Sequence, residues 1–93
     1  MSRDQEFLKL ISVALDACEK ARLEALSRGE SWMVEDAATA RSQFGKIAEQ
    51  VKGNTLAPSQ GGGLGITRAL SEWAPAYLYA AGEAVEDYYM RNW

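Results

Sequence analysis

Apolar residues recur every three or four positions through the first half of the chain, the spacing that places side chains on one face of an α-helix. Two stretches show this pattern, residues 3–28 and residues 32–52. The first stripe consists of Phe7, Leu8, Ile11, Ala14, Leu15, Cys18, Ala21, Arg22, Ala25 and Leu26. The second consists of Met33, Val34, Ala37, Ala40, Phe44, Ile47, Ala48 and Val51. The pattern predicts two long amphipathic helices.

Residues suited to starting and stopping a helix stand at the ends of both stretches. Ser2, with Gln5 three residues later, has the pattern of a capping box, and Gly29 suits the left-handed residue that ends a helix. Ser31 is the expected cap of the second helix, and Gly53 its stop. Because the link between the two helices is very short, we expect them to be antiparallel neighbours.

The second half of the chain changes character. Residues 54–65 have turn chemistry, three consecutive glycines and no periodicity, so they predict a flexible loop. Residues 66–73 are expected to form either a short helix or an extended segment. Pro75 favours the start of a last helix that runs over residues 75–90. Its expected inward stripe is Leu78, Ala81, Val85, Tyr88 and Tyr89.

Strand-like alternation of β-branched residues does not occur, so the predicted fold is all-α. Residues 1–93 are expected to form a single helical domain, in which an antiparallel helical hairpin carries a third, C-terminal helix packed across it. A chain of this length is sufficient for one small core.

The charge balance narrows the choice of partner. The chain has 13 acidic and 10 basic residues, a net charge of −3. This disfavours nucleic acid, which requires a basic face; it fits a cationic protein partner or simple solubility. The charged start of the chain and the lack of a long apolar run predict no signal peptide and no membrane partner. Cys18 is alone, so we expect a buried thiol in a cytoplasmic protein.

The residue types needed for catalysis are scarce. The chain has no histidine, so it has no Ser-His-Asp triad. The neighbouring carboxylates Glu35-Asp36 and Glu86-Asp87 point about 100° apart on a helix, which is unsuited to a general acid–base pair. The glycine run lacks the Gly-Lys-Ser/Thr ending of a phosphate loop, and the acidic residues lack the spacing of a calcium loop. We expect no enzymatic activity, no cofactor and no metal site.

Large aromatic residues are concentrated in the last third of the chain. Phe44, Tyr88 and Tyr89 fall on the apolar stripes and are expected in the core. Five other rings suit either boundary packing or a partner interface, where Trp and Tyr often anchor binding: Trp32, Trp73, Tyr77, Tyr79 and Trp93. The predicted partner-binding surface is the exposed side of the last helix and the segment before it. Its residues are Glu72, Trp73, Tyr77, Glu83, Glu86 and Asp87.

The order of these features resembles the small all-helical immunity proteins that neutralise NAD-degrading effectors of bacterial type VI secretion. The shared layout is a first amphipathic helix from Phe7 to Leu26, a break at Gly29 and a second helix that ends near Val51. It continues with a Leu64-Gly65 step, a helix start at Pro75 and a final helix bearing Ala80-Ala81 and Tyr88-Tyr89. The glycine run at 61–63 does not match the family pattern, so no functional residue is transferred from it.

The resemblance implies an antitoxin that binds a cognate toxin domain, an NAD-hydrolysing or ADP-ribosylating effector, and blocks its active site without a cofactor. Two other functions remain open on sequence alone. One is a structural or adaptor subunit that self-associates, for example as a homodimer. The other is a regulator that binds a small ligand in an aromatic pocket between helices. The loop at residues 54–65 is either a mobile connector or a flap that reshapes on a partner.

Overall fold

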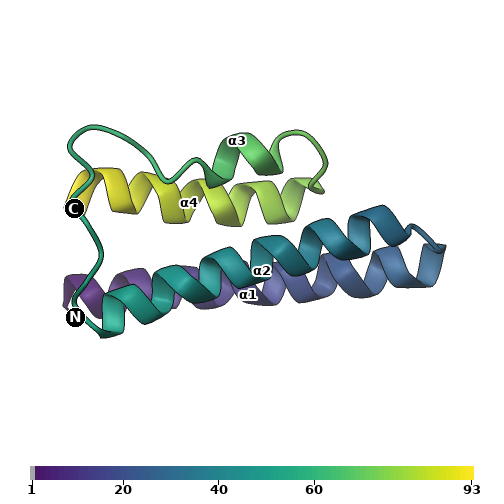
Figure 1. Ribbon diagram of the computed structural model, residues 1–93, viewed down its shortest axis with the longest axis horizontal. Coiled ribbons are helices and arrows are strands. Elements are labelled where there is room, and N and C mark those ends of the chain that lie inside the picture. Colours follow the sequence, from purple (N-terminus) through teal and green to yellow (C-terminus); the bar gives the residue numbers. More distant parts are fainter. Residues whose placement is uncertain (1) are drawn as a thin grey trace.

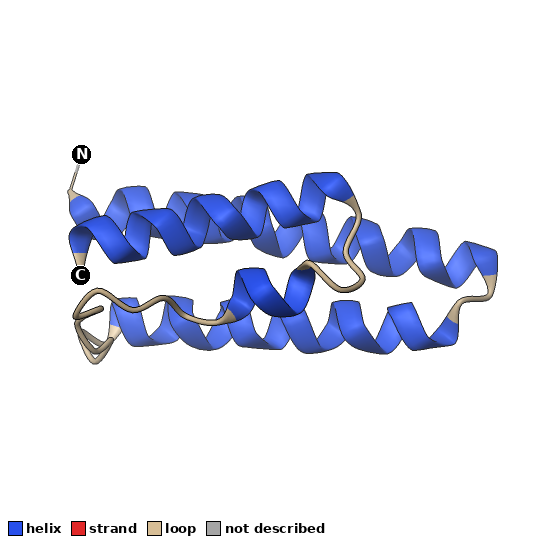
Figure 2. Cartoon of the chain, turned by 90° about the horizontal axis from the view of Figure 1, so that it is seen from above, coloured by secondary structure: helices blue, strands red, loops and turns tan. Residues whose placement is uncertain are grey.

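The computed structural model describes residues 2–93, which form four helices: α1 (Arg3–Arg28), α2 (Ser31–Lys52), α3 (Ile66–Leu70) and α4 (Ala76–Asn92). These helices contain 76% of the described residues, and no strand occurs among them. α1 and α2 form an antiparallel hairpin, α4 lies alongside it, and α3 lies beside α4 and over α2 (Figures 1 and 2). The molecule measures 40 × 21 × 19 Å. The predicted all-α fold is confirmed.

The start and end of α1 follow the sequence prediction closely. The Gln5 backbone N–H donates to Ser2 Oγ at 3.1 Å, and the Ser2 N–H donates to Gln5 Oε1 at 3.2 Å, which completes the capping box. Gly29 ends the helix in the left-handed region with φ of 73°. The Glu30 N–H then donates to the carbonyl of Ala25 at 2.9 Å, so the chain turns sharply towards α2.

The ends of α2 and α4 differ from the prediction by one or two residues. The N-cap of α2 is Glu30 rather than Ser31, because the tight turn after Gly29 lets Ser31 enter the helix itself, and no side chain caps it. α4 begins at Ala76, after Pro75 in an extended conformation, and continues to Asn92 instead of stopping at Met90. The Trp93 N–H bonds the Tyr89 carbonyl at 2.9 Å and so extends the last turn.

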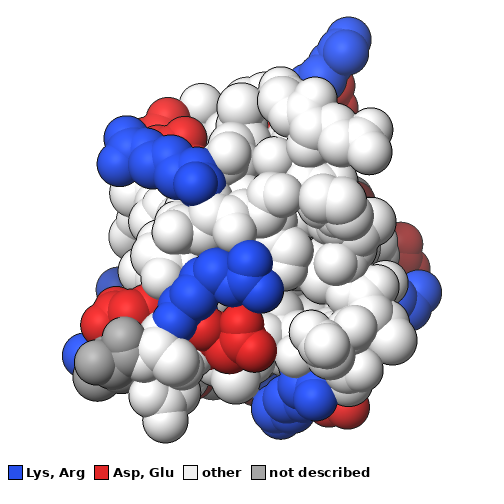
Figure 3. Space-filling model, turned by 90° about the vertical axis from the view of Figure 1, so that its left-hand side faces the viewer, with Lys and Arg blue, Asp and Glu red and all other residues white. Residues whose placement is uncertain are grey.

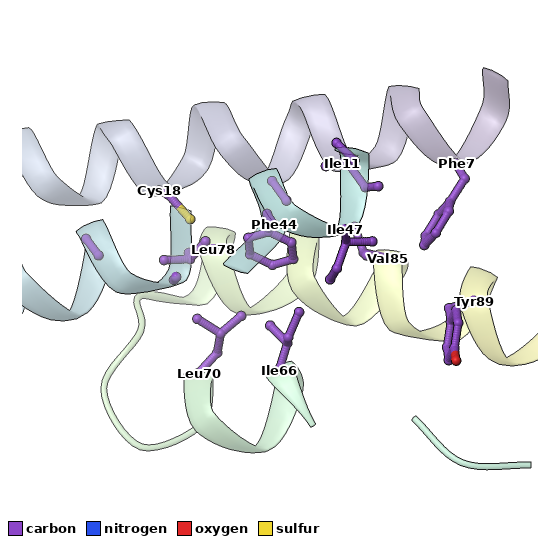
Figure 4. Close-up of a cluster of buried hydrophobic side chains, with 14 of the residues drawn as sticks. Phe7, Ile11, Cys18, Phe44, Ile47, Ile66, Leu70, Leu78, Val85 and Tyr89 are labelled. Carbon is purple, nitrogen blue, oxygen red and sulfur yellow. The ribbon is translucent and has the colours of Figure 1, made fainter. Parts of the chain in front are cut away.

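All four helices contribute side chains to one core (Figure 4). Phe7, Ile11 and Cys18 of α1 face Phe44 and Ile47 of α2, in agreement with the two predicted stripes. Cys18 is fully buried, so the predicted buried thiol is confirmed, and this burial raises the pKa of the thiol to about 11. The remaining labelled core residues are Ile66, Leu70, Leu78, Val85 and Tyr89.

The predicted apolar stripe of α1 differs from the observed burial at the C-terminal end of the helix. Leu26 was expected in the core but is exposed, because the end of the hairpin projects past the start of α4 and no other element covers it (Figures 1 and 2). On α4, Ala81 and Tyr88 are only partly buried, and Gly82 takes the inward position.

Gly82 is the place where α3 packs against α4. A Cβ atom added to Gly82 would collide with Leu70 Cδ1 and lie 3.5 Å from Phe44 Cζ. Leu70 is buried and anchors the short α3, which settles the alternative left open for residues 66–73. The missing side chain of Gly82 therefore makes room for α3.

Hydrogen bonds hold α4 to α1 at both ends. The Tyr77 hydroxyl donates to the Glu24 carboxylate near the start of α4. At the other end, the Tyr88 hydroxyl donates to the Arg3 carbonyl at 3.2 Å, and Arg3 Nη1 donates to the Asn92 carbonyl at 2.9 Å. The two chain termini consequently lie at the same end of the molecule (Figures 1 and 2).

Aromatic rings close this terminal end. The Phe7 ring lies 4.7 Å from the Trp93 ring and 5.6 Å from the Tyr88 ring, measured between centroids. The Arg3 guanidinium carbon sits 3.8 Å from the centroid of Trp93. Trp93 thus packs within the fold, where the sequence left its role open. Viewed from this end, basic and acidic side chains lie side by side (Figure 3).

The loop at residues 54–65 follows α4 back along the molecule. The Tyr89 hydroxyl donates to the Ala57 carbonyl at 2.8 Å, and Leu56 and Leu64 pack against the core. Gly63 lies against the Glu86 side chain. These contacts tether the loop at several points, and its mobility between them remains a prediction.

Candidate protein-binding site

The six residues predicted to bind a partner separate into three groups. Tyr77 and Glu86 bond within the fold, Glu83 and Asp87 lie on the outer face of α4, and Glu72 and Trp73 stand at the turn between α3 and α4. The predicted surface is therefore divided by the packing of the helices, and each group has its own chemistry.

Tyr77 is a structural residue as well as a partly exposed ring. Its hydroxyl donates to Glu24, and the Lys20 ammonium lies 4.3 Å from the centroid of its ring. Burial, followed by the bond to Glu24, raises the pKa of Tyr77 to about 12. Tyr77 therefore joins α4 to α1, and its predicted role in binding a partner stays a prediction.

Glu86 is likewise directed inward. Its Oε1 atom accepts a hydrogen bond of 3.1 Å from the backbone N–H of Thr67, in the first turn of α3. The first N–H groups of a helix have no carbonyl acceptor within that helix, and Glu86 supplies an acceptor for the one at Thr67. The side chain helps to seat α3 on α4, so a charge reversal here disturbs the fold in addition to any surface charge.

Glu83 and Asp87 are exposed and lie one turn apart on α4. They present two carboxylates to solvent on the side of α4 that faces away from the core. Exposed carboxylates of this kind attract a cationic partner over long range.

Glu72 and Trp73 line a groove of about 220 Å³ between α2 and α3. The turn that follows α3 fixes their position: the Trp73 and Ala74 N–H groups both bond the Leu70 carbonyl, at 3.2 and 2.8 Å. From α2, Asp36 joins the wall of the groove. The full lining is Asp36, Thr39, Ala40, Gln43, Ile66, Ala69, Leu70, Glu72 and Trp73.

This groove combines an apolar floor with two carboxylates and a partly buried Trp ring. Asp36 and Glu72 are the charged residues of the lining, so the groove suits the aliphatic stem and cationic head of a Lys or Arg side chain. The partner-binding surface predicted from sequence does not include Asp36. The pairing of α2 with the α3–α4 turn is a tertiary contact for which the local pattern contains no indication.

A wider hollow of about 690 Å³ lies between α1 and α2. Arg22 there donates to Glu19 at 2.6 Å, and this hydrogen bond lowers the pKa of Glu19. The walls also include Ala38, Ser42 and Gly45. Leu15 and Arg41 complete the lining. This hollow therefore lacks the aromatic side chain and the pair of carboxylates that the groove of Trp73 combines.

Two further findings concern the described residues as a whole. Within residues 2–93, no group of three or more His, Cys, Asp or Glu side chains is placed to hold a metal ion. Over the same range, none of the helices combines the length and apolar character needed to cross a membrane.

Comparison with protein families, with curated proteins and with solved structures found no match to this chain.

Proposed function

We propose that this chain is an immunity protein that binds a bacterial toxin domain and blocks its active site. The observation that carries the proposal is the groove in which Trp73 stands beside the carboxylates of Glu72 and Asp36. A ring and two charges converge there on a hollow open to solvent. This combination is typical of a protein interface with a central aromatic anchor and a charged rim.

The acidic character of the site favours a partner whose surface is basic. Enzymes that act on NAD must hold an anionic pyrophosphate, so basic side chains or helix N-termini surround their active sites. Carboxylates on an inhibitor complement such a cleft electrostatically. The resemblance of the sequence layout to the immunity proteins of NAD-degrading effectors supports the same class of partner.

The proposal predicts that a gene beside this chain's gene encodes a toxin domain, and co-expression of the chain with that domain tests it. We expect the two proteins to co-purify and the chain to protect cells from the toxin. Trp73→Ala should weaken the complex about 30-fold or more, chiefly through faster dissociation, because a ring at the centre of an interface typically contributes about 2 kcal/mol or more. Surface plasmon resonance measures both rates.

Charge variants provide the matched comparison. Asp36→Lys combined with Glu72→Lys should slow association and reduce its dependence on salt. Asp16→Lys, an exposed change on α1, should leave association nearly unchanged. A wild-type chain that neither binds nor inhibits the toxin domain would refute the proposal.

A further inference from the structure

The end of the hairpin, residues 23–36, is here called the hairpin tip. Its outer part extends past the start of α4, so neither α3 nor α4 covers it (Figures 1 and 2). At its base, Glu24 accepts a hydrogen bond from Tyr77 of α4, and Asp36 lines the groove beside α3. Three of its large apolar side chains are more than half exposed: Leu23 at 51%, Leu26 at 58% and Trp32 at 54%. Side chains of this kind gathered in one uncovered segment indicate a contact surface.

Beside Leu26 the tip is hollowed. A pocket of about 260 Å³ is lined by Leu26, Gly29, Glu30, Ser31, Val34 and Glu35. Pockets for small-molecule ligands usually measure roughly 300–1,000 Å³, so this one is better matched to a single large side chain. Leu26 and Val34 form its apolar walls, and Glu30 and Glu35 place carboxylates at its edge.

The hairpin tip also contains the entire net charge of the protein. Its four carboxylates, from Glu24, Glu30, Glu35 and Asp36, are opposed by Arg28 alone, a net charge of −3. The rest of the chain has nine acidic and nine basic residues. The pairing of the exposed Arg28 with the partly buried Glu30 is loose, at 3.8 Å between Nη1 and Oε1, and neutralises little of the charge.

We propose that the hairpin tip docks a partner segment in which a large apolar side chain is flanked by Lys or Arg. The apolar side chain enters the pocket beside Leu26, and the basic groups meet Glu30 and Glu35. A second copy of this chain is a poor occupant, because two tips of charge −3 repel each other.

One residue of the tip, Trp32, lies on the same face of α2 as the acidic groove, whereas Val34 and Glu35, which line the pocket beside Leu26, point to other faces of α2. Trp32 stands one helical turn before Asp36, which lines the groove of Trp73. A partner that fills the groove thus meets Trp32 next. The inference deepens the proposed function, because it names the chemistry of the partner. The docking surface itself does not depend on the proposed function, and only the identification of the partner with a toxin rests on it.

Selection of random dodecapeptides displayed on phage against the folded chain tests the docking surface without reference to any toxin. We expect enriched peptides to combine Trp, Phe or Leu with Lys or Arg. Their binding should fall about tenfold or more with Leu26→Ala, and similarly with Glu30→Gln and Glu35→Gln together, because these side chains line the pocket. Val13→Ala and Met90→Ala remove exposed apolar side chains far from the tip and should have little effect.

Other results would overturn the docking surface. These are the absence of enriched peptides, peptides without basic residues, or peptides that bind the tip variants as well as the parent. A dimer of the free chain that Leu26→Ala dissociates would assign the tip to a second copy instead. If peptides behave as expected while the wild-type chain fails to bind the toxin domain, the proposed function fails and the docking surface stands.

Discussion

Tyr77 shows how a single side chain serves packing while it borders a candidate interface. Its ring lies under the Lys20 ammonium, and its hydroxyl donates to Glu24, 53 residues earlier in the chain. Loss of the phenolic proton would remove the donor and place a second negative charge beside the carboxylate. The neutral form of Tyr77 is therefore part of the folded state.

The pH dependence of stability follows from this arrangement. The pKa of Tyr77 is raised from 10 to about 12 in the folded state, so the folded protein holds this proton more tightly than the unfolded chain. The stabilisation is complete below about pH 10 and is lost as the pH rises towards 12.

Urea unfolding of the parent and of Tyr77→Phe measures this effect. Between pH 9 and about 11.5, the free energy of unfolding should fall more for the parent than for Tyr77→Phe. Tyr79→Phe is the matched control and should follow the parent. Parallel curves for the parent and Tyr77→Phe would show that the Tyr77 proton does not contribute to stability.

At the scale of single residues, sequence alone identified chemistry better than position. The sequence showed the scarcity of catalytic groups, and its apolar pattern predicted the burial of Cys18. The internal roles of Tyr77 and Glu86 were not, because their partners, Glu24 and Thr67, belong to other helices. A Tyr and a Glu on an amphipathic helix look the same whether they face a partner protein or a neighbouring helix.

Between elements, the contact of α3 with α4 depends on Gly82. Glycine inside a helix normally costs about 1 kcal/mol relative to alanine, and here the absent Cβ leaves space for Leu70. Gly82→Ala should nevertheless destabilise the protein by about 1 kcal/mol, because the cost of overpacking a core is about 1–3 kcal/mol.

A second substitution separates overpacking from helix propensity. Leu70→Val removes the Cδ atoms that a Cβ at position 82 would meet. In that background, Gly82→Ala should stabilise the protein, and thermal unfolding of the four variants completes the double-mutant cycle. If Gly82→Ala stabilises the parent as well, the glycine is not required for the seating of α3.

The sequence predicted the structure of the hairpin in detail, but it predicted the second half of the chain only in outline, and the reason is physical. Capping residues and apolar periodicity act within a few residues of each other, so α1 and α2 could be read locally. The path of residues 54–75 is set by tertiary contacts such as the bond from Tyr89 to Ala57 and the burial of Leu70. The exposure of Leu26 could not be predicted for the same reason, because its surroundings depend on where α4 starts.

The whole molecule has two different ends. At the terminal end, Phe7, Tyr88 and Trp93 pack on one another and charges of both signs are interspersed (Figure 3). The hairpin tip at the opposite end is uncovered, apolar and acidic. The groove of Trp73 lies between them, on the side of α2 that faces α3. The groove and the tip together give the protein one side and one end suited to a basic partner.

The most direct test of the proposed inhibition is a titration of the toxin domain that the proposal predicts in a neighbouring gene, with consumption of NAD followed as the chain is added. Immunity function predicts that activity falls in proportion to the added chain and ends at one equivalent. Trp73→Ala and Trp32→Ala should shift the curve to higher concentrations, whereas Val13→Ala should not. Full toxin activity in the presence of excess wild-type chain, shown by circular dichroism to be folded, would contradict the proposed function.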